Sequence, residues 1–330
     1  MKASVKQDVT GLEPTSCPAN DGVQVPARFR IWVEKEQDFS MNKVSSIRHN
    51  FQDHPLFQLD KLESLAHRLL PHKQCRFAAQ GVTHKSEFLH FDKSPEGKDL
   101  DHVFRNISEP GSWIALYNAQ LDPAYAQVAE EALATVKHLV ERDQPGIFRP
   151  ELYFFISSAP SITPFHIDRV HNFWLQLRGR KILSTWDPGD RTVVPAPIVE
   201  NFIVDNSLHE VILQDEFMSR QRDWDVGASE GVFMPSTSPH TARTCESSGG
   251  SEDSVSVSAA LAFYTETTRK IGYIHSFNRV LRRFGASPKF PGESRFDSLK
   301  PYLGQAVVGL RKRFRDYEPP AGFEHPELRP

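Results

Sequence analysis

The segment from Ile162 to Lys181 reads ITPFHIDRVHNFWLQLRGRK, and it indicates the fold more strongly than any other stretch of the chain. Its apolar residues are mostly β-branched or aromatic, which favours strands over helices. Arg178–Gly179 supplies a turn before the next apolar run begins at Lys181. Short strands separated by such turns are typical of an antiparallel sandwich or barrel.

The same texture continues on both sides of this segment. Glycine and proline turns such as Pro188–Gly189 and Pro195–Pro197 separate the apolar runs. Strands and helices do not alternate here, so a doubly wound parallel sheet is disfavoured. The predicted strands are Leu152–Ser158, Phe173–Leu177, Lys181–Trp186, Val232–Pro235 and Val255–Tyr264.

Helical periodicity appears outside this β-rich region. Apolar residues have helical spacing over Leu59–Leu70 and from Pro123 to about Glu141, where Asp122 can cap the helix. Two further apolar stripes lie within residues 274–284 and 299–314. We therefore predict a mainly β protein with flanking helices (α+β). Its parts are a flexible arm (1–27), an N-terminal α/β segment (28–150), a β-barrel core (151–266) and a C-terminal helical dimerisation segment (267–330).

Composition restricts the class of partner. The chain has 330 residues, 39% of them hydrophobic, and its 39 basic and 42 acidic side chains are intermixed, giving a net charge of −3. Nucleic-acid and membrane surfaces need a concentrated basic field, which this pattern does not supply. Cys17, Cys75 and Cys245 form no CxxC pair, so a disulfide framework or zinc ribbon is disfavoured. We expect a cytoplasmic protein that binds neither nucleic acid nor membrane.

A candidate metal site begins with His166 and Asp168. Residues two apart on a strand point the same way, so both side chains are expected to project into the barrel. His240, in GVFMPSTSPHTAR, can complete a 2-His-1-carboxylate set, which leaves positions open on iron(II). His171 is a rival ligand, but it lies three residues from Asp168 and would point to the opposite face. We interpret His171 as structural, and an isolated HxD pattern is itself a weak indicator.

Three polar residues close to this pair strengthen the interpretation. Lys181 begins the next predicted strand and can hold a carboxylate as a point charge. Thr163 can donate its hydroxyl to the same carboxylate, and Asn172 can form hydrogen bonds nearer the metal. The sequence therefore combines a metal-ligand pattern with a candidate anion site.

With these residues in place, residues 151–264 resemble the JmjC-type, cupin-fold 2-oxoglutarate oxygenases. Their spacing is most similar to that of the asparaginyl hydroxylase that restrains hypoxia-inducible factor. In that pattern a Thr stands three residues before the first His, an Asn six after it and a Lys fifteen after it. Thr163, Asn172 and Lys181 occupy these offsets, and Pro235 stands five residues before His240 as in the family.

The resemblance implies a double-stranded β-helix, or jelly roll, with N-terminal helices and a C-terminal helical pair that forms a homodimer. It implies oxidative decarboxylation of 2-oxoglutarate by iron(II) and dioxygen, coupled to hydroxylation of a peptide side chain or small metabolite. Asp168 stands where an iron halogenase would have Ala or Gly, which favours hydroxylation. The implied metal ligands are His166, Asp168 and His240, and the implied 2-oxoglutarate contacts are Lys181, Thr163 and Asn172.

The sequence also departs from the family pattern. A further Asn near the metal is expected within Val255–Tyr264, which contains none, and Ser256 or Ser258 would be its replacement. The aromatic pair that usually precedes the last His is replaced by Ser236–Pro239. These changes leave the substrate undefined.

Other assignments stay open at this point. Tyr117 and Tyr153 are further candidates for the cofactor pocket, and Arg243 can face a substrate carboxylate, although a surface ion pair is its commoner role. A non-redox cupin enzyme such as an isomerase is one alternative function, but such sites often use three histidines and a glutamate. A non-catalytic cupin-like binding or regulatory protein is the other.

Overall fold

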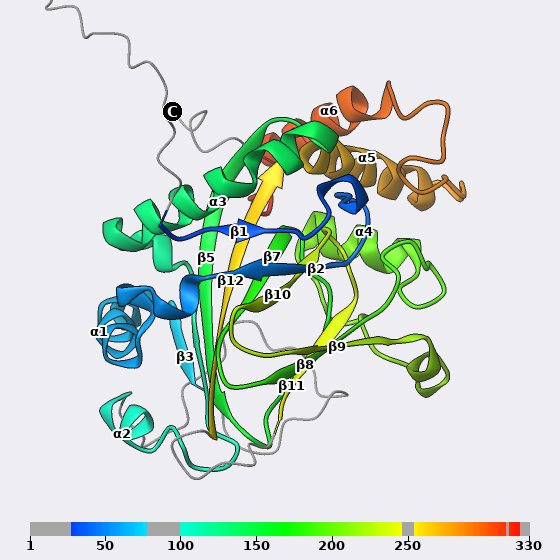
Figure 1. Cartoon of the computed structure of the whole chain (residues 1–330). Coiled ribbons are helices and arrows are strands. Elements are labelled where there is room, and N and C mark those ends of the chain that lie inside the picture. Colours follow the sequence, from blue (N-terminus) through cyan, green and yellow to red (C-terminus); the bar gives the residue numbers. More distant parts are fainter. Residues whose placement is uncertain (1–27, 78–99, 246–253, 315–316, 324–330) are drawn as a thin grey trace, which may run out of the picture.

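The computed structural model describes residues 28–77, 100–245, 254–314 and 317–323, so the predicted arm over residues 1–27 lies outside the described part. Two antiparallel sheets form the centre of the molecule (Figure 1). The strands are β1 (Ile31–Trp32), β2 (Ser45–His49), β3 (Cys75–Phe77), β4 (Trp113–Leu116), β5 (Ile147–Ser158), β6 (Ile162–His166), β7 (His171–Arg178), β8 (Lys181–Thr185), β9 (Arg222–Val226), β10 (Glu230–Met234), β11 (His240–Thr244) and β12 (Val255–Thr265).

Strand order identifies the architecture as a jelly roll. The larger sheet has the order β1-β2-β10-β7-β12-β5-β4-β3, and the smaller sheet has the order β6-β11-β8-β9. The chain from β5 to β12 therefore passes back and forth between the sheets, with β5, β7, β10 and β12 in one and β6, β8, β9 and β11 in the other. This is the double-stranded β-helix arrangement. The predicted fold is confirmed, and the N-terminal strands β1 to β4 extend both edges of the larger sheet.

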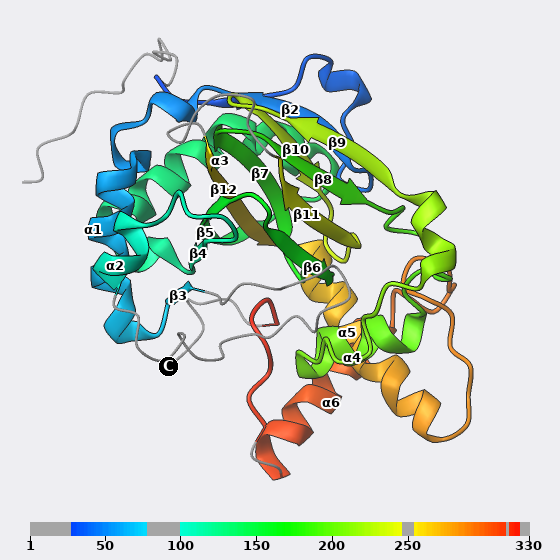
Figure 2. The same ribbon diagram turned by 90° about the horizontal axis from the view of Figure 1, so that it is seen from below.

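Helices flank the two sheets. Figure 2 shows α4, α5 and α6 gathered together, away from α1 and α2. Among the described residues, no helix is both long and apolar enough to cross a membrane. The α-helices are α1 (Leu59–Leu69), α2 (Leu100–Arg105), α3 (Pro123–Asp143), α4 (Ala196–Asp205), α5 (Glu266–Arg283) and α6 (Lys300–Phe314). Short 3-10 helices lie at Glu36–Asp38, Phe51–Asp53, Pro55–Phe57, Leu70–His72, Ala119–Leu121 and Asp215–Arg220.

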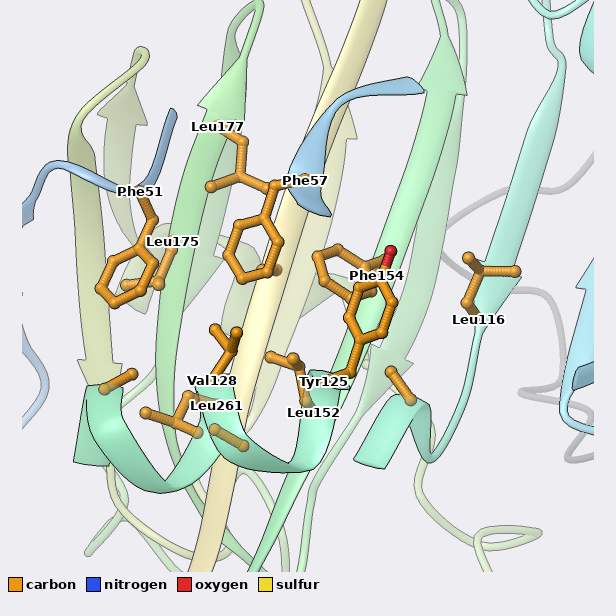
Figure 3. Packing of buried hydrophobic residues seen from close by; sticks show 14 of the residues in the cluster. Phe51, Phe57, Leu116, Tyr125, Val128, Leu152, Phe154, Leu175, Leu177 and Leu261 are labelled. Atoms are coloured by element: carbon orange, nitrogen blue, oxygen red, sulfur yellow. The ribbon is translucent and has the colours of Figure 1, made fainter. Parts of the chain in front are cut away.

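Helix α3 covers the outer face of the larger sheet. Its first turn forms as predicted, because Asp122 accepts a hydrogen bond of 3.0 Å from the backbone N–H of Ala124. Figure 3 shows the buried face of the helix, with Tyr125 and Val128, among side chains of the sheet such as Phe154. Alternate residues of β5 therefore face α3, and those between them face the space between the sheets.

Helix α4 was not predicted from the sequence. We expected Pro195–Pro197 to form a turn, but Pro195 is the N-cap of this helix and Pro197 lies in its first turn. Proline is tolerated there because the first N–H groups of a helix have no intrahelical acceptor. Val199 and Phe202 then bury the apolar side of α4 in the core beside the smaller sheet.

The C-terminal helices form as predicted, but the apolar stripe of α6 is mostly exposed. In α5, Ile274 is buried, whereas Phe284, just past the helix, is 85% exposed. In α6, Leu310 is 57% exposed and Phe314 is 72% exposed. The two helices approach each other closely at Gly304, because a Cβ added there would lie 1.8 Å from the carbonyl oxygen of Tyr273.

Gly304→Ala should therefore destabilise the fold. Its methyl group would meet the backbone of α5, so the helices must separate, and overpacking of this kind costs about 1–3 kcal/mol of the free energy of unfolding. Gly309→Ala is the matched control in the same helix, since nothing lies within 4 Å of its added Cβ. The control should stabilise the helix by about 0.5–1 kcal/mol. Chemical denaturation measures both, and equal effects of the two variants would contradict the close approach.

Candidate metal centre and cofactor pocket

Three side chains that can bind a metal converge at one end of the barrel. His166 ends β6 and His240 begins β11, and the two residues are direct partners across the antiparallel pair, with ring centroids 4.0 Å apart. The carboxylate of Asp168 lies 4.0 Å from Nε2 of His166 and 3.6 Å from Nε2 of His240. One donor atom from each residue lies within 4.8 Å of the others, so all three can hold one ion.

Backbone carbonyls orient both imidazoles. Nδ1 of His166 lies 2.8 Å from the carbonyl oxygen of Pro164, and Nδ1 of His240 lies 2.9 Å from that of Ser238. A carbonyl oxygen only accepts, so each Nδ1 carries the proton and donates it. Nε2 then presents its lone pair, which is the arrangement that supports metal-binding histidines.

A second acidic and histidine group lies at the surface. Glu63, His67 and Asp101 also bring donor atoms within 4.8 Å, but His67 and Asp101 are exposed and form a 2.8 Å ion pair with each other. Exposed groups of this kind are common without a metal. The buried set at the barrel end is the better candidate.

The route by which Asp168 reaches the site differs from our prediction. β6 ends at His166, so Asp168 lies in the turn beyond the strand rather than on the same strand face. The backbone carbonyl of Asp168 accepts a 2.7 Å hydrogen bond from the N–H of Thr237, which ties this turn to the segment before β11. The ligands converge because two connecting segments are joined, and strand parity was the wrong reason.

His171 lies away from the metal set, at the start of β7. Its Nδ1 accepts a 3.2 Å hydrogen bond from the N–H of Ser236, so its Nε2 carries the proton that it donates to Gln144 at 3.0 Å. Burial lowers the pKa of His171 from 6.5 to about 3. The ring is therefore neutral and holds two segments together. Asn172 and Trp174 of β7 line the cavity, so His171, which alternates with them, points to the other side of the strand.

The metal set opens onto a cavity of about 270 Å³ between the two sheets. His240 pairs with Thr185 on β8, and Lys181 lies four residues away along that strand, so it lies farther into the barrel. The cavity wall includes all of the predicted site residues and the aromatic side chains Trp113 and Trp174. The six predicted residues in the wall are Thr163, His166, Asp168, Asn172, Lys181 and His240.

Lys181 is a buried cation without a counter-ion. It is 4% exposed, and burial lowers the pKa of its ammonium from 10.5 to about 7. No carboxylate pairs with it in the described part of the chain. Lys300 is similarly buried but lies 3.0 Å from Asp297. A buried ammonium is costly unless it is paired, so Lys181 indicates an anion that enters the cavity as a ligand.

Asn172 also has an unused polar atom. It lies on β7 opposite Met234 and Ala262, is 6% exposed, and its Oδ1 has no hydrogen-bond partner among the residues that the structure describes. Buried amide oxygens nearly always accept a hydrogen bond. Asn172 can therefore accept one from a water or ligand in the cavity.

The candidates left open in the sequence separate into two groups. Tyr117 and Tyr153 both line the cavity. Ser256 and Ser258 do not, because both hydroxyls are hydrogen-bonded to Gln176, each at 2.8 Å. The residues of β12 that line the cavity are Ala260 and Tyr264.

Arg149, Glu151, Arg169 and Tyr264 also line the cavity but were not predicted. Arg149 Nε lies 2.5 Å from Glu151 Oε1, and the hydroxyl of Tyr153 donates to the other oxygen of Glu151. Strand periodicity could have indicated Glu151, since Glu151 and Tyr153 alternate with the core residues of β5 and so share the face that Tyr153 presents to the cavity. Nothing in the sequence marked Arg169 apart from its place directly after Asp168.

Comparisons with known proteins give only distant similarities. No model of a protein family matches the chain, and no curated protein does. Similar solved structures include E. coli YcfD, at 13% identity and a TM-score of 0.44 over 84% of this chain and 67% of that chain. The E. coli ribosomal oxygenase YcfD in complex with cobalt and 2-oxoglutarate has 12% identity and a TM-score of 0.43, over 87% and 69% of the chains.

The non-heme α-ketoglutarate-dependent epimerase SnoN from nogalamycin biosynthesis is also similar, at 12% identity and a TM-score of 0.42 over 69% of this chain and 80% of that chain. Similarity at this level does not assign an activity. The assignment therefore depends on the chain's own jelly roll, its three metal-binding side chains and the unpaired Lys181 beside them.

Proposed function

We propose that this protein is an iron(II)- and 2-oxoglutarate-dependent oxygenase that hydroxylates its substrate. The observation that carries the proposal is the shared cavity. One wall presents His166, Asp168 and His240, and a buried ammonium without a counter-ion, Lys181, lies farther in. A metal site and an anion site in one small cavity suit a ligand that chelates the metal at one end and carries a carboxylate at the other.

The residues present fit iron(II). Two imidazoles with Nε2 as donor and one carboxylate form the facial set that non-heme iron oxygenases use. Bound iron would supply the activation of dioxygen that couples decarboxylation of 2-oxoglutarate to oxidation of the substrate. Lys181 would hold the far carboxylate of 2-oxoglutarate, with the Thr163 hydroxyl beside it. The buried walls, including Trp174, would exclude water from the reaction.

The test is incubation of the purified protein with iron(II), 2-oxoglutarate and oxygen. We expect succinate to form with consumption of oxygen, faster when a cell extract supplies the substrate, and a product heavier by one oxygen atom. A non-redox cupin would bind metal without forming succinate. A binding protein would leave 2-oxoglutarate intact in every condition, and that result would reject the oxygenase.

The alternatives fit the cavity less well. The described residues assemble no three-histidine and glutamate set, because His171 is directed to Gln144 and Glu151 is held by Arg149. A purely structural role does not explain an unpaired buried lysine beside an oriented ligand set.

Cys75 and Cys245 are both free thiols, which supports the proposal of a reducing, cytoplasmic location.

We also propose that the protein is a homodimer through α5, α6 and the segment between them. Several large apolar side chains are exposed there. An apolar surface of this kind is usually covered by a partner in solution. The exposed residues are Phe284 (85%), Phe296 (55%), Leu299 (55%), Tyr302 (71%), Leu310 (57%) and Phe314 (72%).

Light scattering coupled to size exclusion should therefore give twice the mass of the chain. Leu310→Asp places a charge in this surface and should shift the protein to a monomer. Ile212→Asp is the matched control, because Ile212 is 62% exposed but lies outside these helices. A wild-type monomer, or equal dissociation by both variants, would remove the proposed interface.

A further inference from the structure

Arg169 has a guanidinium with unused donors at the metal cavity. It follows Asp168 directly in the chain and lines the same cavity. Its Nε and Nη1 are buried and have no hydrogen-bond partner among the described residues. Its guanidinium carbon lies 5.4 Å from the centroid of the Phe202 ring, a contact that supplies no oxygen or nitrogen acceptor.

The acidic groups near Arg169 are already committed. Glu151 accepts from Arg149 at 2.5 Å and from the hydroxyl of Tyr153. The Asp168 carboxylate faces His166 and His240 and belongs to the metal set. The phenol of Tyr264 beside Arg169 stays neutral, because burial raises its pKa. In the part of the chain that the structure describes, no carboxylate neutralises Arg169.

Two other partly buried arginines have acidic partners. Arg282 Nε lies 2.8 Å from Glu200, and Arg311 Nη2 lies 2.9 Å from Asp205. Unsatisfied buried donors on a charged group are costly, so an acceptor from outside the chain, such as a water, an ion or a ligand, is expected at Arg169. Arg243, the arginine first considered for this role, instead lies 3.8 Å from Asp223 on the surface.

The position of Arg169 indicates a small ligand. Arg169, Tyr264 and Ala321 line both the metal cavity and a second cavity of about 350 Å³, so Arg169 lies where the two meet. Phe202 of α4 and Ala321, from the described segment after α6, narrow this region. Figure 2 shows that segment folding back from α6 toward the barrel. Cavities of this size suit a small ligand.

We propose that Arg169 binds the carboxylate of a small organic acid, and that this acid is the substrate oxidised at the metal. The inference rests on the proposed oxygenase function. A planar guanidinium matches a carboxylate in shape and charge, and one uncompensated cation suits one singly charged group. Lys181 lies deeper in the barrel and is left for 2-oxoglutarate, so the two acids occupy different ends of the site.

The position also predicts where the acid is oxidised. Arg169 follows Asp168 directly in the chain, and it lines the same cavity of about 270 Å³ as the metal set, so a carboxylate bound there would lie close to the metal. The oxidised C–H bond should lie within a few bonds of the carboxylate. One atom of dioxygen enters that C–H bond to give an alcohol, the other enters succinate, and 2-oxoglutarate loses carbon dioxide.

Binding tests this proposal without turnover. The full-length protein is loaded with manganese(II) and saturating 2-oxoglutarate under nitrogen, so the deep site is already filled. Calorimetry and thermal shift then compare amino acids and aliphatic and aromatic acids of two to ten carbons with their primary amides, and with phosphate esters of similar size. We expect at least one carboxylic acid to bind and its amide to bind at least about tenfold more weakly.

Arg169→Gln should weaken binding of that acid by at least about tenfold and leave the affinity for 2-oxoglutarate unchanged. Arg243→Gln, the surface control, should bind the acid like the wild type. Binding of none of the acids, equal binding of acid and amide, preference for phosphate esters, or a loss confined to 2-oxoglutarate would overturn the proposal. Succinate formation is measured separately, so loss of the oxygenase function would be recognised independently.

Discussion

Replacing His166, Asp168 or His240 with alanine is expected to lower iron(II) affinity by more than about 100-fold and to abolish succinate formation. Loss of a residue that only orients a ligand typically costs 10- to 100-fold in metal affinity, so loss of a ligand should cost more. The three donor atoms lie within 4.8 Å, so no member is dispensable. Iron retained after desalting, measured by plasma mass spectrometry, and succinate formation are the two readouts.

The matched control for the triad is His67→Ala. It disrupts the exposed group formed with Glu63 and Asp101 and should leave both iron retention and turnover unchanged. If His67→Ala removed the iron and His166→Ala did not, the metal would belong at the surface. Circular dichroism and a cooperative melt establish that each variant is folded.

Replacing Lys181 with methionine should raise the concentration of 2-oxoglutarate needed for half-maximal turnover by about 10- to 100-fold. A hydrogen bond to a charged group contributes about 1.5–3 kcal/mol, and the methionine keeps the length of the side chain without its charge. Iron affinity in the absence of 2-oxoglutarate should change little. Lys137→Met, an exposed position on α3, is the control. An unchanged 2-oxoglutarate requirement in Lys181→Met would place the anchor elsewhere.

The lowered pKa of Lys181 also predicts a pH dependence. Only the protonated ammonium attracts the carboxylate, and without a ligand its pKa is about 7. Binding of 2-oxoglutarate should therefore weaken as pH rises above 7, by up to about tenfold per pH unit, until the raised pKa of the bound state is reached. In Lys181→Met, the affinity for 2-oxoglutarate should not fall in this way as pH rises. Calorimetric titrations from pH 6.5 to 9 on both proteins test the difference.

The same lysine should reduce stability in the absence of ligand. The folded-state pKa lies below the unfolded value of 10.5, so the folded chain disfavours the charged form. The penalty is absent above pH 10.5 and grows as pH falls toward 7. Lys181→Met should therefore unfold at a higher denaturant concentration than the wild type at pH 7 when 2-oxoglutarate is absent.

Much of the barrel could be predicted from local patterns. Strands such as β5, β7 and β12 have apolar runs bounded by turns, and Asp122 with Pro123 begins α3 as their chemistry requires. The site was predictable to the extent that its residues lie at fixed offsets along β6, β7 and β8, which follow one another in the chain. Thr163 and Lys181 both lie in the cavity wall for this reason.

The remaining features depend on tertiary contacts that no local pattern contains. Asp168 reaches the metal site because Thr237 holds its turn, and α4 begins at prolines that usually separate strands. Arg169 joins the cavity because α4 and the chain after α6 pack beside it. Ser258 was a reasonable pocket candidate by its position in the sequence, but its hydroxyl donates a hydrogen bond to Gln176 and does not face the cavity.

The direct pairing of His166 with His240 also links metal binding to the stability of the fold. These residues join β6 to β11, strands that are adjacent in the smaller sheet but distant along the chain. An ion shared by both is a removable cross-link that the unfolded chain cannot reproduce, and at 100 times its Kd it adds about 2.7 kcal/mol to stability. We therefore expect iron starvation to shorten the lifetime of the protein in the cell, so that metal supply sets its abundance as well as its rate.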